Sequence, residues 1–325
     1  MQKPRRHEDY KVAVLFAMEF EMSAFRYMLD ATHPSLGRAP GDSNRYILGS
    51  VASHNVVLTT LSGQQGTNAA ATVSSDLSRT FPAIEWRLLV GIGGGVTSAT
   101  TDMRLGDVVI SMPNETNGGV IQYDLGREWD GRFQRTGFLD APPRYLRSAV
   151  DEMRSTHRGT GNNIMAFVEK LVQSGDDMDE YKRPDEPDLL FPDEVRHQPT
   201  TAVNQEPCSE CDKSLAIHRG PRNPEGKVKI HYGVIASRNS LIVSTEKRKE
   251  IIDRIGHQVM CFEMEAVGVM SDKPCLVVRG ISDYADSHKN RGWRHYAAAT
   301  AAACAKDLLS HVESTMAKTE IEAAF

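Results

Sequence analysis

Cysteine is scarce in this sequence, and that scarcity argues against a small secreted protein held together by disulfides. The 325 residues contain 5 cysteines, an odd and scattered set that does not form a disulfide framework. A reducing cytoplasmic or nuclear location is therefore expected. Long apolar runs are also missing, since none approaches the ~20 residues that span a bilayer. The polar start Met1–Asp9 lacks the apolar core of a signal peptide, so no membrane partner is expected.

An excess of basic charge is missing too. Lys and Arg number 38 against 43 Asp and Glu, which gives a formal net charge of −5. This balance argues against an electrostatic nucleic-acid binder. What the chain does contain is 40% hydrophobic and 25% charged residues, a composition typical of a globular protein with a substantial core.

Runs rich in Val, Ile and Leu recur along the chain with helix-like segments between them. Strands are predicted at Val12–Phe16, Val56–Leu61, Leu88–Ile92, Val108–Ser111, Lys229–Ala236 and Leu276–Ile281. Helices are predicted at Phe20–Leu29, Thr67–Thr80, Glu246–Ile255, Glu265–Ser271 and Tyr296–Glu313. Because the strand runs are continuously apolar rather than alternating, both faces of the sheet should be buried. This order predicts an α/β domain with a large central sheet.

Residues 155–226, the polar segment, break this regularity. They are rich in acidic residues and clustered prolines and have no sustained strand period, although Asn163–Gln173 suits one short helix. Stretches this long without secondary structure are usually functional lids or disordered segments. We interpret the polar segment as an insertion within a single domain, residues 1–325, and not as a second domain.

Cys208 and Cys211 lie in the polar segment with the C-x₂-C spacing of half a zinc site, and His197 and His218 are nearby. A structural zinc site normally has four ligands at characteristic spacing, and neither a second C-x₂-C nor an H-x₃₋₅-H follows in the sequence. Two loop thiols are the simpler interpretation, so no metal ion and no cofactor is predicted.

A glycine-rich motif, Gly91-Ile-Gly-Gly-Gly95, follows the apolar run Leu88–Val90. Glycine lets backbone N–H groups approach a ligand closely. The spacing is not the G-x-G-x-x-G of a dinucleotide site, and the Gly-Lys-Ser/Thr of a P-loop is absent from the motif. Two interpretations stay open: a turn that lines a ligand site, and a tight connection packed against the sheet.

Three acidic residues are predicted to gather at one end of the sheet. Glu263 and Glu265 flank Met264 at a predicted helix start, and Asp283 follows the buried run Cys275–Ile281. In α/β folds the carboxyl ends of strands and the neighbouring helix starts are where chemistry is usually placed. The alternative is a capped, solvated helix start without a chemical role.

Four segments in register resemble the nucleoside phosphorylase/nucleosidase superfamily. They are Ala17-Met-Glu-Phe-Glu21, Gly91-Ile-Gly-Gly-Gly95 with Leu105-Gly-Asp-Val-Val109, Gly233-Val-Ile-Ala-Ser237, and Glu263-Met-Glu265 with Ser282-Asp283. Together they span residues 12–310 in the family's order. The resemblance implies a single three-layer α/β/α domain with a central mixed β-sheet. The motif His231-Tyr-Gly233 and the stretch Asp283–Asn290 are most similar to fungal members.

The resemblance also implies a role for individual residues. Family members cleave the N-glycosidic bond through a cation-like ribosyl transition state. Asp283 matches the residue that protonates N7 of the departing purine, which requires a pKa about 3 units above the ~3.9 of free Asp. Glu265 matches the residue that bonds the ribose hydroxyls, with Met264 packed against the sugar. The expected substrate-binding set also includes Glu263, Gly93, Gly94 and Gly95.

The nucleophile is indicated by the segment after the first strand. Phosphorylases of the hexameric type hold phosphate with an Arg and a Ser near the glycine motif, where this sequence has Leu89 and Ile92. They also carry Gly-Asp-Pro where this sequence has Ala17-Met-Glu-Phe-Glu21, which is similar to methylthioadenosine/S-adenosylhomocysteine nucleosidase. There, Glu21 matches the carboxylate that activates water, and a carboxylate repels phosphate. Hydrolysis is therefore favoured, with a phosphate site rebuilt on Arg45 or another arginine as the alternative.

The base-binding segment departs from that nucleosidase. In Ser237-Arg-Asn-Ser-Leu-Ile242, Leu241 stands where the nucleosidase has an aromatic that stacks on adenine, next to Ile242, and Asn239 stands where it has an acid. An ordinary purine nucleoside is therefore the expected small-molecule partner. His288, Lys289 and Asn290 are left open as contacts to the substrate or to a neighbouring subunit.

These residues lead us to expect a purine nucleoside N-ribohydrolase, with Glu21 as base and Asp283 as acid. The resemblance adds a homo-oligomer, either a dimer or a hexamer. The alternatives are a phosphate-dependent purine nucleoside phosphorylase and a non-catalytic nucleoside-sensing module. Retention of the three carboxylates Glu21, Glu265 and Asp283 argues against a mere binder.

Overall fold

The computed structural model describes residues 5–98, 100–198, 208, 210–221, 227–256, 258–289 and 291–313. Its strands are β1 Val12–Phe16, β2 Ala31–His33, β3 Ile47–Val51, β4 His54–Thr60, β5 Trp86–Gly95, β6 Val108–Ser111, β7 Val120–Gln122, β8 Gly126–Trp129, β9 Arg132–Arg135, β10 Ile230–Ser237, β11 Val259–Glu263 and β12 Leu276–Asp283. Its α-helices are α1 Glu19–Arg26, α2 Thr67–Thr80, α3 Arg144–Thr160, α4 Ile164–Val172, α5 Thr245–Ile255, α6 Ala266–Met270 and α7 Arg294–Ser310. Short 3₁₀ turns are η1 His7–Asp9, η2 Asp176–Tyr181 and η3 Lys213–Leu215.

A mixed sheet of 10 strands forms the centre of the molecule. Its order is β11-β10-β6-β12-β5-β1-β4-β3-β2, with β7 paired to β10. Strands β12, β5, β1 and β4 are parallel, whereas β6 is antiparallel to β12 and β3 is antiparallel to β4. In addition, β11 pairs antiparallel with the glycine-rich end of β5. Strands β11, β10, β6, β12 and β5 therefore close into a ring of paired strands.

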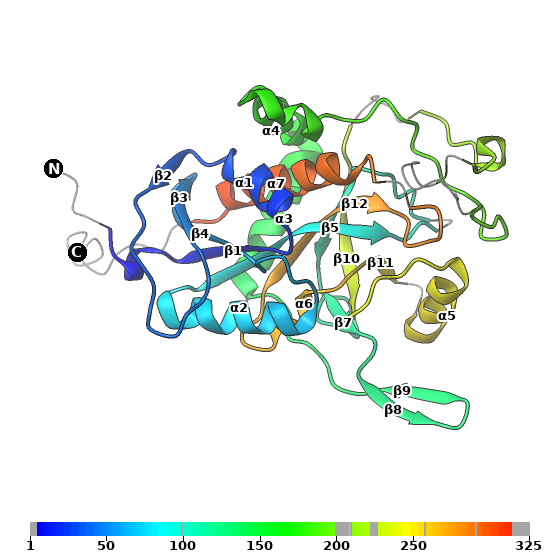
Figure 1. Ribbon diagram of the computed structural model, residues 1–325, viewed down its shortest axis with the longest axis horizontal. Helices are drawn as coiled ribbons and strands as arrows, with labels where there is room; N and C mark the ends of the chain where they lie inside the picture. Colours follow the sequence, from blue (N-terminus) through cyan, green and yellow to red (C-terminus); the bar gives the residue numbers. More distant parts are fainter. Residues whose placement is uncertain are drawn as a thin grey trace.

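Helices cover both faces of the sheet. Figure 1 shows α1, α7 and α4 on one side and α2 and α6 on the other. Within β1, Val12, Val14 and Phe16 pack into the first of these two layers, and Ala13 and Leu15 pack into the second. This is why the strand is continuously apolar: each face has its own core. The predicted three-layer α/β/α fold class is confirmed.

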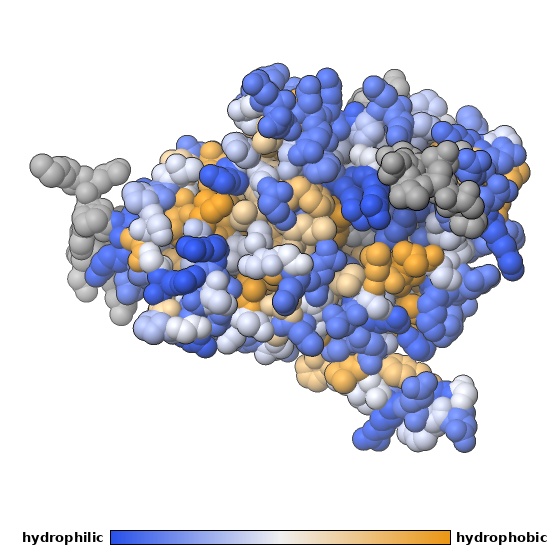
Figure 2. All heavy atoms as spheres, in the orientation of Figure 1, coloured by the Kyte–Doolittle hydropathy of each residue, from blue (hydrophilic) through white to orange (hydrophobic). Residues whose placement is uncertain are grey.

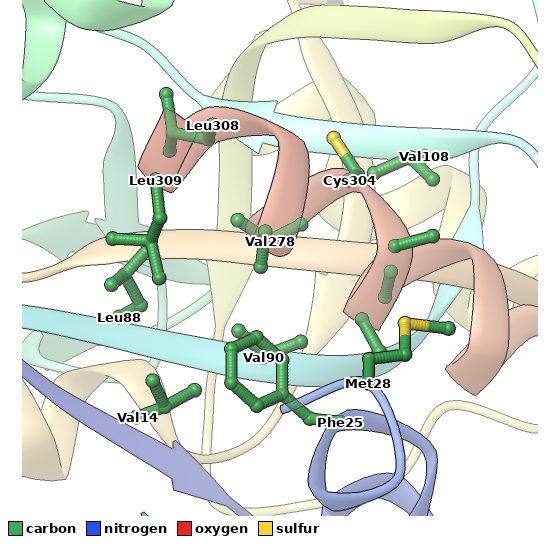
Figure 3. Packing of buried hydrophobic residues seen from close by; sticks show 14 of the residues in the cluster. Val14, Phe25, Met28, Leu88, Val90, Val108, Val278, Cys304, Leu308 and Leu309 are labelled. Carbon is green, nitrogen blue, oxygen red and sulfur yellow. The ribbon is translucent and has the colours of Figure 1, made fainter. Parts of the chain in front are cut away.

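Helix α7 lies at the centre of the first core layer. It is alanine-rich and almost wholly buried, so it can approach the sheet closely. A Cβ on Gly280 in β12 would collide with the backbone of Ala297 in α7. Figure 3 shows Leu308, Leu309 and Cys304 of α7 against strand residues such as Val278.

Most predicted elements are present with shifted ends. The predicted Thr67–Thr80 matches α2, whereas the predicted Leu88–Ile92 is the middle of a longer strand, β5. The short helix expected at Asn163–Gln173 is α4. Helix α3 runs to Thr160 and so crosses the predicted start of the polar segment. Among the described residues, no helix combines the length and apolar character that crossing a bilayer requires.

Candidate active site

Three glutamates surround one buried arginine at the carboxyl end of the sheet. Glu21, Glu263 and Glu265, called the carboxylate cluster, lie around Arg279 of β12. The guanidinium Nη2 of Arg279 donates to Glu263 Oε2 at 2.5 Å and to Glu265 Oε2 at 3.2 Å. Burial disfavours the guanidinium charge, but the three carboxylates outweigh it and raise the Arg279 pKa. Arg279 therefore stays charged and organises the cluster.

Glu21 reaches the cluster from the first turn of α1. Its Oε2 accepts a hydrogen bond from the Met18 N–H at 2.9 Å, and its Oε1 accepts one from the Ile92 N–H at 2.8 Å. A side chain at Gly91 would collide with this carboxylate and with Arg279, so glycine is needed there. Burial raises the Glu21 pKa, and the charge of Arg279 and the backbone donors oppose the rise. The result is a rigidly held carboxyl group with increased basicity.

Glu265 begins α6 and faces the start of α2. The Gly66 N–H donates to its Oε1 at 3.2 Å, while its Oε2 accepts from Arg279. Burial, assisted by the nearby Glu263 and Glu21 carboxylates, raises the pKa of Glu265 to about 7, and Arg279 opposes the rise. Met264 beside it is half-buried. Both residues stay candidates for the sugar-binding roles predicted for them.

Glu263 differs from the prediction of a substrate-binding side chain. Its side chain is fully buried, and its Oε2 accepts from the N–H groups of Glu265 at 3.0 Å and Ala266 at 2.9 Å as well as from Arg279. These bonds fix the start of α6 and orient Arg279. The side chain is fully enclosed, which favours a role in holding Arg279 and α6 over direct contact with a substrate, although its Oε1 has no hydrogen-bond partner among the described residues.

Asp283 ends β12 next to the glycine-rich end of β5. Its Oδ1 accepts from the Ala285 N–H at 2.9 Å, and its Oδ2 accepts from the Ser282 hydroxyl at 3.0 Å. The Lys289 ammonium lies 3.2 Å from the same carboxylate. Lys289 therefore contacts the predicted acid itself, and its contact to the substrate or to a neighbouring subunit stays a prediction. Asn290 lies outside the described residues.

The glycine motif is the end of strand β5 rather than a turn. A Cβ on Gly93 would lie 3.0 Å from the carbonyl oxygen of Phe262, and one on Gly94 would lie 2.9 Å from Asp283 Oδ1. A Cβ on Gly95 would lie 2.8 Å from Ile281. The glycines therefore let β11 and β12 close around β5, which matches the packing interpretation. Their predicted contact with a nucleoside stays a proposal.

The predicted base-binding segment lies over the start of α2. Asn239 Oδ1 accepts from the Thr67 N–H at 3.0 Å, which caps that helix. Ile242 is buried, whereas Leu241 is 57% exposed. Arg238 stacks over the ring of Tyr123 at 5.5 Å and is only partly exposed. Leu241 thus lines an open surface and not an enclosed pocket wall in this single chain.

Cys208 and Cys211 are not isolated loop thiols, as the sequence suggested. Their sulfur atoms lie within 3.3 to 3.7 Å of the Nδ1 atoms of His197 and His288. The other histidine considered, His218, is exposed and outside this group. The missing partner, His288, lies far along the chain in the loop after β12, so local spacing could not reveal it.

Arg279 belongs to the candidate site but was not predicted from the sequence. It stands in the middle of an apolar strand run, Leu276–Ile281, where a charged side chain is rarely tolerated without partners. That position was the available signal, because a buried arginine implies buried acids nearby. Together the cluster offers two carboxyl groups of raised pKa and a fixed cation. Such a site suits proton transfer and the stabilisation of a developing positive charge.

Comparison with known proteins places this geometry in a family context. The model of the phosphorylase superfamily matches residues 11–314. A nucleotide-binding leucine-rich repeat (NLR)-like protein of Hyaloscypha variabilis is 41% identical over 304 residues, which are 93% of this chain. The chain spans 29% of the length of that relative.

Solved structures share the fold at low sequence identity. The 5'-methylthioadenosine/S-adenosylhomocysteine nucleosidase of Neisseria meningitidis, in complex with methylthio-immucillin-A, is 18% identical with a TM-score of 0.58, covering 92% of this chain and 98% of that chain. The futalosine hydrolase of Helicobacter pylori is 15% identical with a TM-score of 0.58, covering 94% of this chain and 99% of that chain.

Proposed function

The chain belongs to the phosphorylase superfamily, and from that premise we propose that it is a purine nucleoside N-ribohydrolase. It would cleave the bond between purine and ribose with water and release the free base and ribose. The observation that carries this proposal is the placement of Glu21. Within the carboxylate cluster its carboxylate is held by two backbone N–H groups, and burial raises its pKa toward the value of a useful base.

Each step of the reaction has a candidate residue. Glu21 accepts a proton from water as the oxygen attacks the anomeric carbon of the sugar. Asp283 donates a proton to N7 of the purine as the N-glycosidic bond breaks. Glu265 accepts hydrogen bonds from the ribose hydroxyls. The cation-like ribosyl group that forms between these events is stabilised by nearby carboxylates, an interaction stronger in the transition state than in the bound nucleoside.

Lys289 adds a requirement to this scheme. Its ammonium contacts the Asp283 carboxylate at 3.2 Å. The purine must therefore take the place of Lys289 at one oxygen of Asp283 before the proton can be delivered. The bonds from Ser282 and the Ala285 N–H hold Asp283 in position during that exchange.

Water is favoured over phosphate by the electrostatics of the cluster. Phosphate needs cationic donors, but the one guanidinium in the cluster, that of Arg279, is engaged by Glu263 and Glu265. Arg45, the alternative phosphate ligand, is exposed. An anion entering beside Glu21 would also meet a carboxylate. The names of the solved neighbours, a nucleosidase and a hydrolase, agree with this choice.

A second function is favoured by a different observation. The 41% identical relative is named as an NLR-like protein, and this chain spans 29% of its length. In a longer protein of that kind, the domain would serve as a nucleoside-sensing module without turnover.

Product analysis separates the three functions. The purified chain is incubated with adenosine, inosine, guanosine and methylthioadenosine, with and without inorganic phosphate. We expect free base and ribose at equal rates in both conditions. Ribose 1-phosphate formed only with phosphate would show a phosphorylase. Binding by calorimetry without release of base from any nucleoside would show a sensing module.

A further inference from the structure

A second group of side chains, separate from the carboxylate cluster, converges on one point. It consists of His197, Cys208 and Cys211 from the polar segment and His288 from the loop between β12 and α7. One ligand atom from each lies within 4.8 Å of all the others. We propose that these four residues, the Cys₂His₂ group, bind one structural zinc ion that fastens the polar segment to the β12–α7 loop.

The distances within the Cys₂His₂ group match a zinc tetrahedron. Zinc binds sulfur at about 2.3 Å and imidazole nitrogen at about 2.0 to 2.1 Å, so tetrahedral angles separate sulfur from nitrogen by about 3.6 Å. The four sulfur–nitrogen separations are 3.5 and 3.7 Å for Cys208 and 3.3 and 3.6 Å for Cys211. These four separations are the ones expected when a single ion at the centre binds all four ligand atoms.

The surroundings orient the ligands for this role. The Nε2–H of His288 donates to the carbonyl oxygen of Val195 at 3.0 Å, which leaves its Nδ1 lone pair directed at the sulfurs. The ring of Phe191 stacks on the His288 ring at 4.1 Å with an angle of 19°. The Cys211 N–H donates to the Cys208 carbonyl at 3.2 Å, which closes the turn that brings the two thiols together.

The chemistry of the donors selects the ion and its function. Thiolate and imidazole ligands favour zinc over calcium or magnesium, which take oxygen ligands. Four protein ligands fill a tetrahedral shell and leave no position for water, so the site is structural and not catalytic. Thiol–imidazole hydrogen bonds alone are weak and offer little reason to gather four such groups. Both cysteines are free of disulfides.

The site joins two parts of the chain that matter for the proposed reaction. His288 directly precedes Lys289, whose ammonium contacts Asp283. Fixing His288 therefore fixes the position of Lys289. The polar segment also contacts the loop after β12 through Tyr284, whose hydroxyl accepts from Arg219 Nη2 at 2.7 Å and donates to Asp188 Oδ1 at 2.5 Å. Zinc would complete this attachment at the turn that carries Cys208 and Cys211.

Metal content of the 325-residue chain is the direct test. The chain is purified without chelator, and its zinc is measured by elemental mass spectrometry and native mass spectrometry. We expect about one zinc per chain in the wild type, and loss of the metal in Cys208→Ser and Cys211→Ser. His218→Ala is the matched control, because His218 is an exposed histidine of the same segment outside the Cys₂His₂ group; it should retain the metal.

Cobalt substitution identifies the ligands without relying on a variant. After chelation and addition of cobalt(II), the wild type should show thiolate-to-cobalt charge-transfer bands and tetrahedral d–d bands. Chelation should also increase proteolytic cleavage within 161–221. Three results would overturn the proposal: a folded wild type that binds neither metal, a cobalt spectrum without thiolate bands, or full zinc retention in both cysteine variants. The last would place the ion elsewhere, for instance at His157, Asp307 and His311.

Discussion

Glu265 ionises in a place where burial opposes its charge. Its pKa rises from the model-peptide value of 4.5 to about 7. Between these values the folded chain keeps the proton and the unfolded chain has released it, so the stability contributed by this residue falls as pH rises. We expect Glu265→Gln to gain stability relative to the wild type as pH rises from about 4.5 to about 7, by at most about 3 kcal/mol. Urea unfolding at several pH values measures the difference.

A constant stability difference across that pH window would contradict the raised pKa of Glu265. The baseline cost of the substitution itself does not matter for this comparison, because only the pH dependence is used. Glu19→Gln serves as the control, since Glu19 is an exposed carboxylate on α1. Its stability difference from the wild type should show no such increase between pH 4.5 and 7.

Glu21 is the residue whose removal tests the proposed chemistry. Glu21→Gln keeps the shape of the side chain but removes its capacity to take a proton from water. We expect kcat to fall by about 10²- to 10⁴-fold, with folding intact by circular dichroism. Glu19→Gln on the same helix should keep full activity. Release of base by Glu21→Gln at the wild-type rate would remove Glu21 from the mechanism.

At the scale of elements, the approach of β12 to α7 sets the position of the site. Arg279, Asp283 and Gly280 all belong to β12, and a side chain on Gly280 would collide with the backbone of Ala297. We expect Gly280→Ala to destabilise the fold by about 1 to 3 kcal/mol, because the helix must move away from the strand. Thermal unfolding with parallel activity measurements provides the readout.

Gly159→Ala is the matched control for that substitution. Gly159 lies near the end of α3, and nothing stands within 4 Å of the Cβ it would gain. Alanine favours the helix there by about 0.5 to 1 kcal/mol, so this variant should be slightly stabilised. If Gly280→Ala unfolded at the wild-type temperature, close packing of α7 on β12 would not be the reason for glycine.

The strands and helices show how much of the fold a single sequence predicts. Runs such as Val12–Phe16 were predictable because burial on both faces leaves a continuously apolar strand. The extension of β5 through Gly95 was not predictable. Its pairing with β11 forms only in the folded chain, and glycine by itself indicates a turn. The individual predictions for Glu21 and Glu265 came from family motifs. Their meeting at Arg279 depends on three elements distant in sequence.

The Cys₂His₂ group shows the same limit of sequence-based prediction for a cluster of side chains. Half of it was visible as Cys208 and Cys211, because those two ligands share one turn. His288 is separated from them by strands β10 to β12, and only the fold brings it close. Local spacing rules cannot detect a residue that another element contributes to such a group.

At the scale of the whole molecule, exposed apolar side chains indicate where the surface of a partner protein is expected to pack. Phe138 is 85% exposed and Leu125 is 48% exposed, on either side of the β8–β9 hairpin. Figure 2 shows apolar residues where this hairpin joins the body of the molecule. Leu241, predicted to line the base site, is 57% exposed as well. Exposed apolar surface of this kind often marks a protein interface.

We therefore expect this chain to form a homo-oligomer in which a second copy covers these residues and completes the base side of the site. Light scattering after size exclusion should give a mass of two or six chains. Phe138→Ser should shift the assembly toward monomer at micromolar concentration. It should also raise KM more than it lowers kcat, because the second copy is expected to contact the bound base and not the reacting bond. Phe133, only partly exposed on the hairpin itself and packed against Arg254, offers a comparison through Phe133→Leu, which should leave the mass unchanged. A wild-type monomer with full activity would show that one copy suffices and that the exposed residues serve another contact.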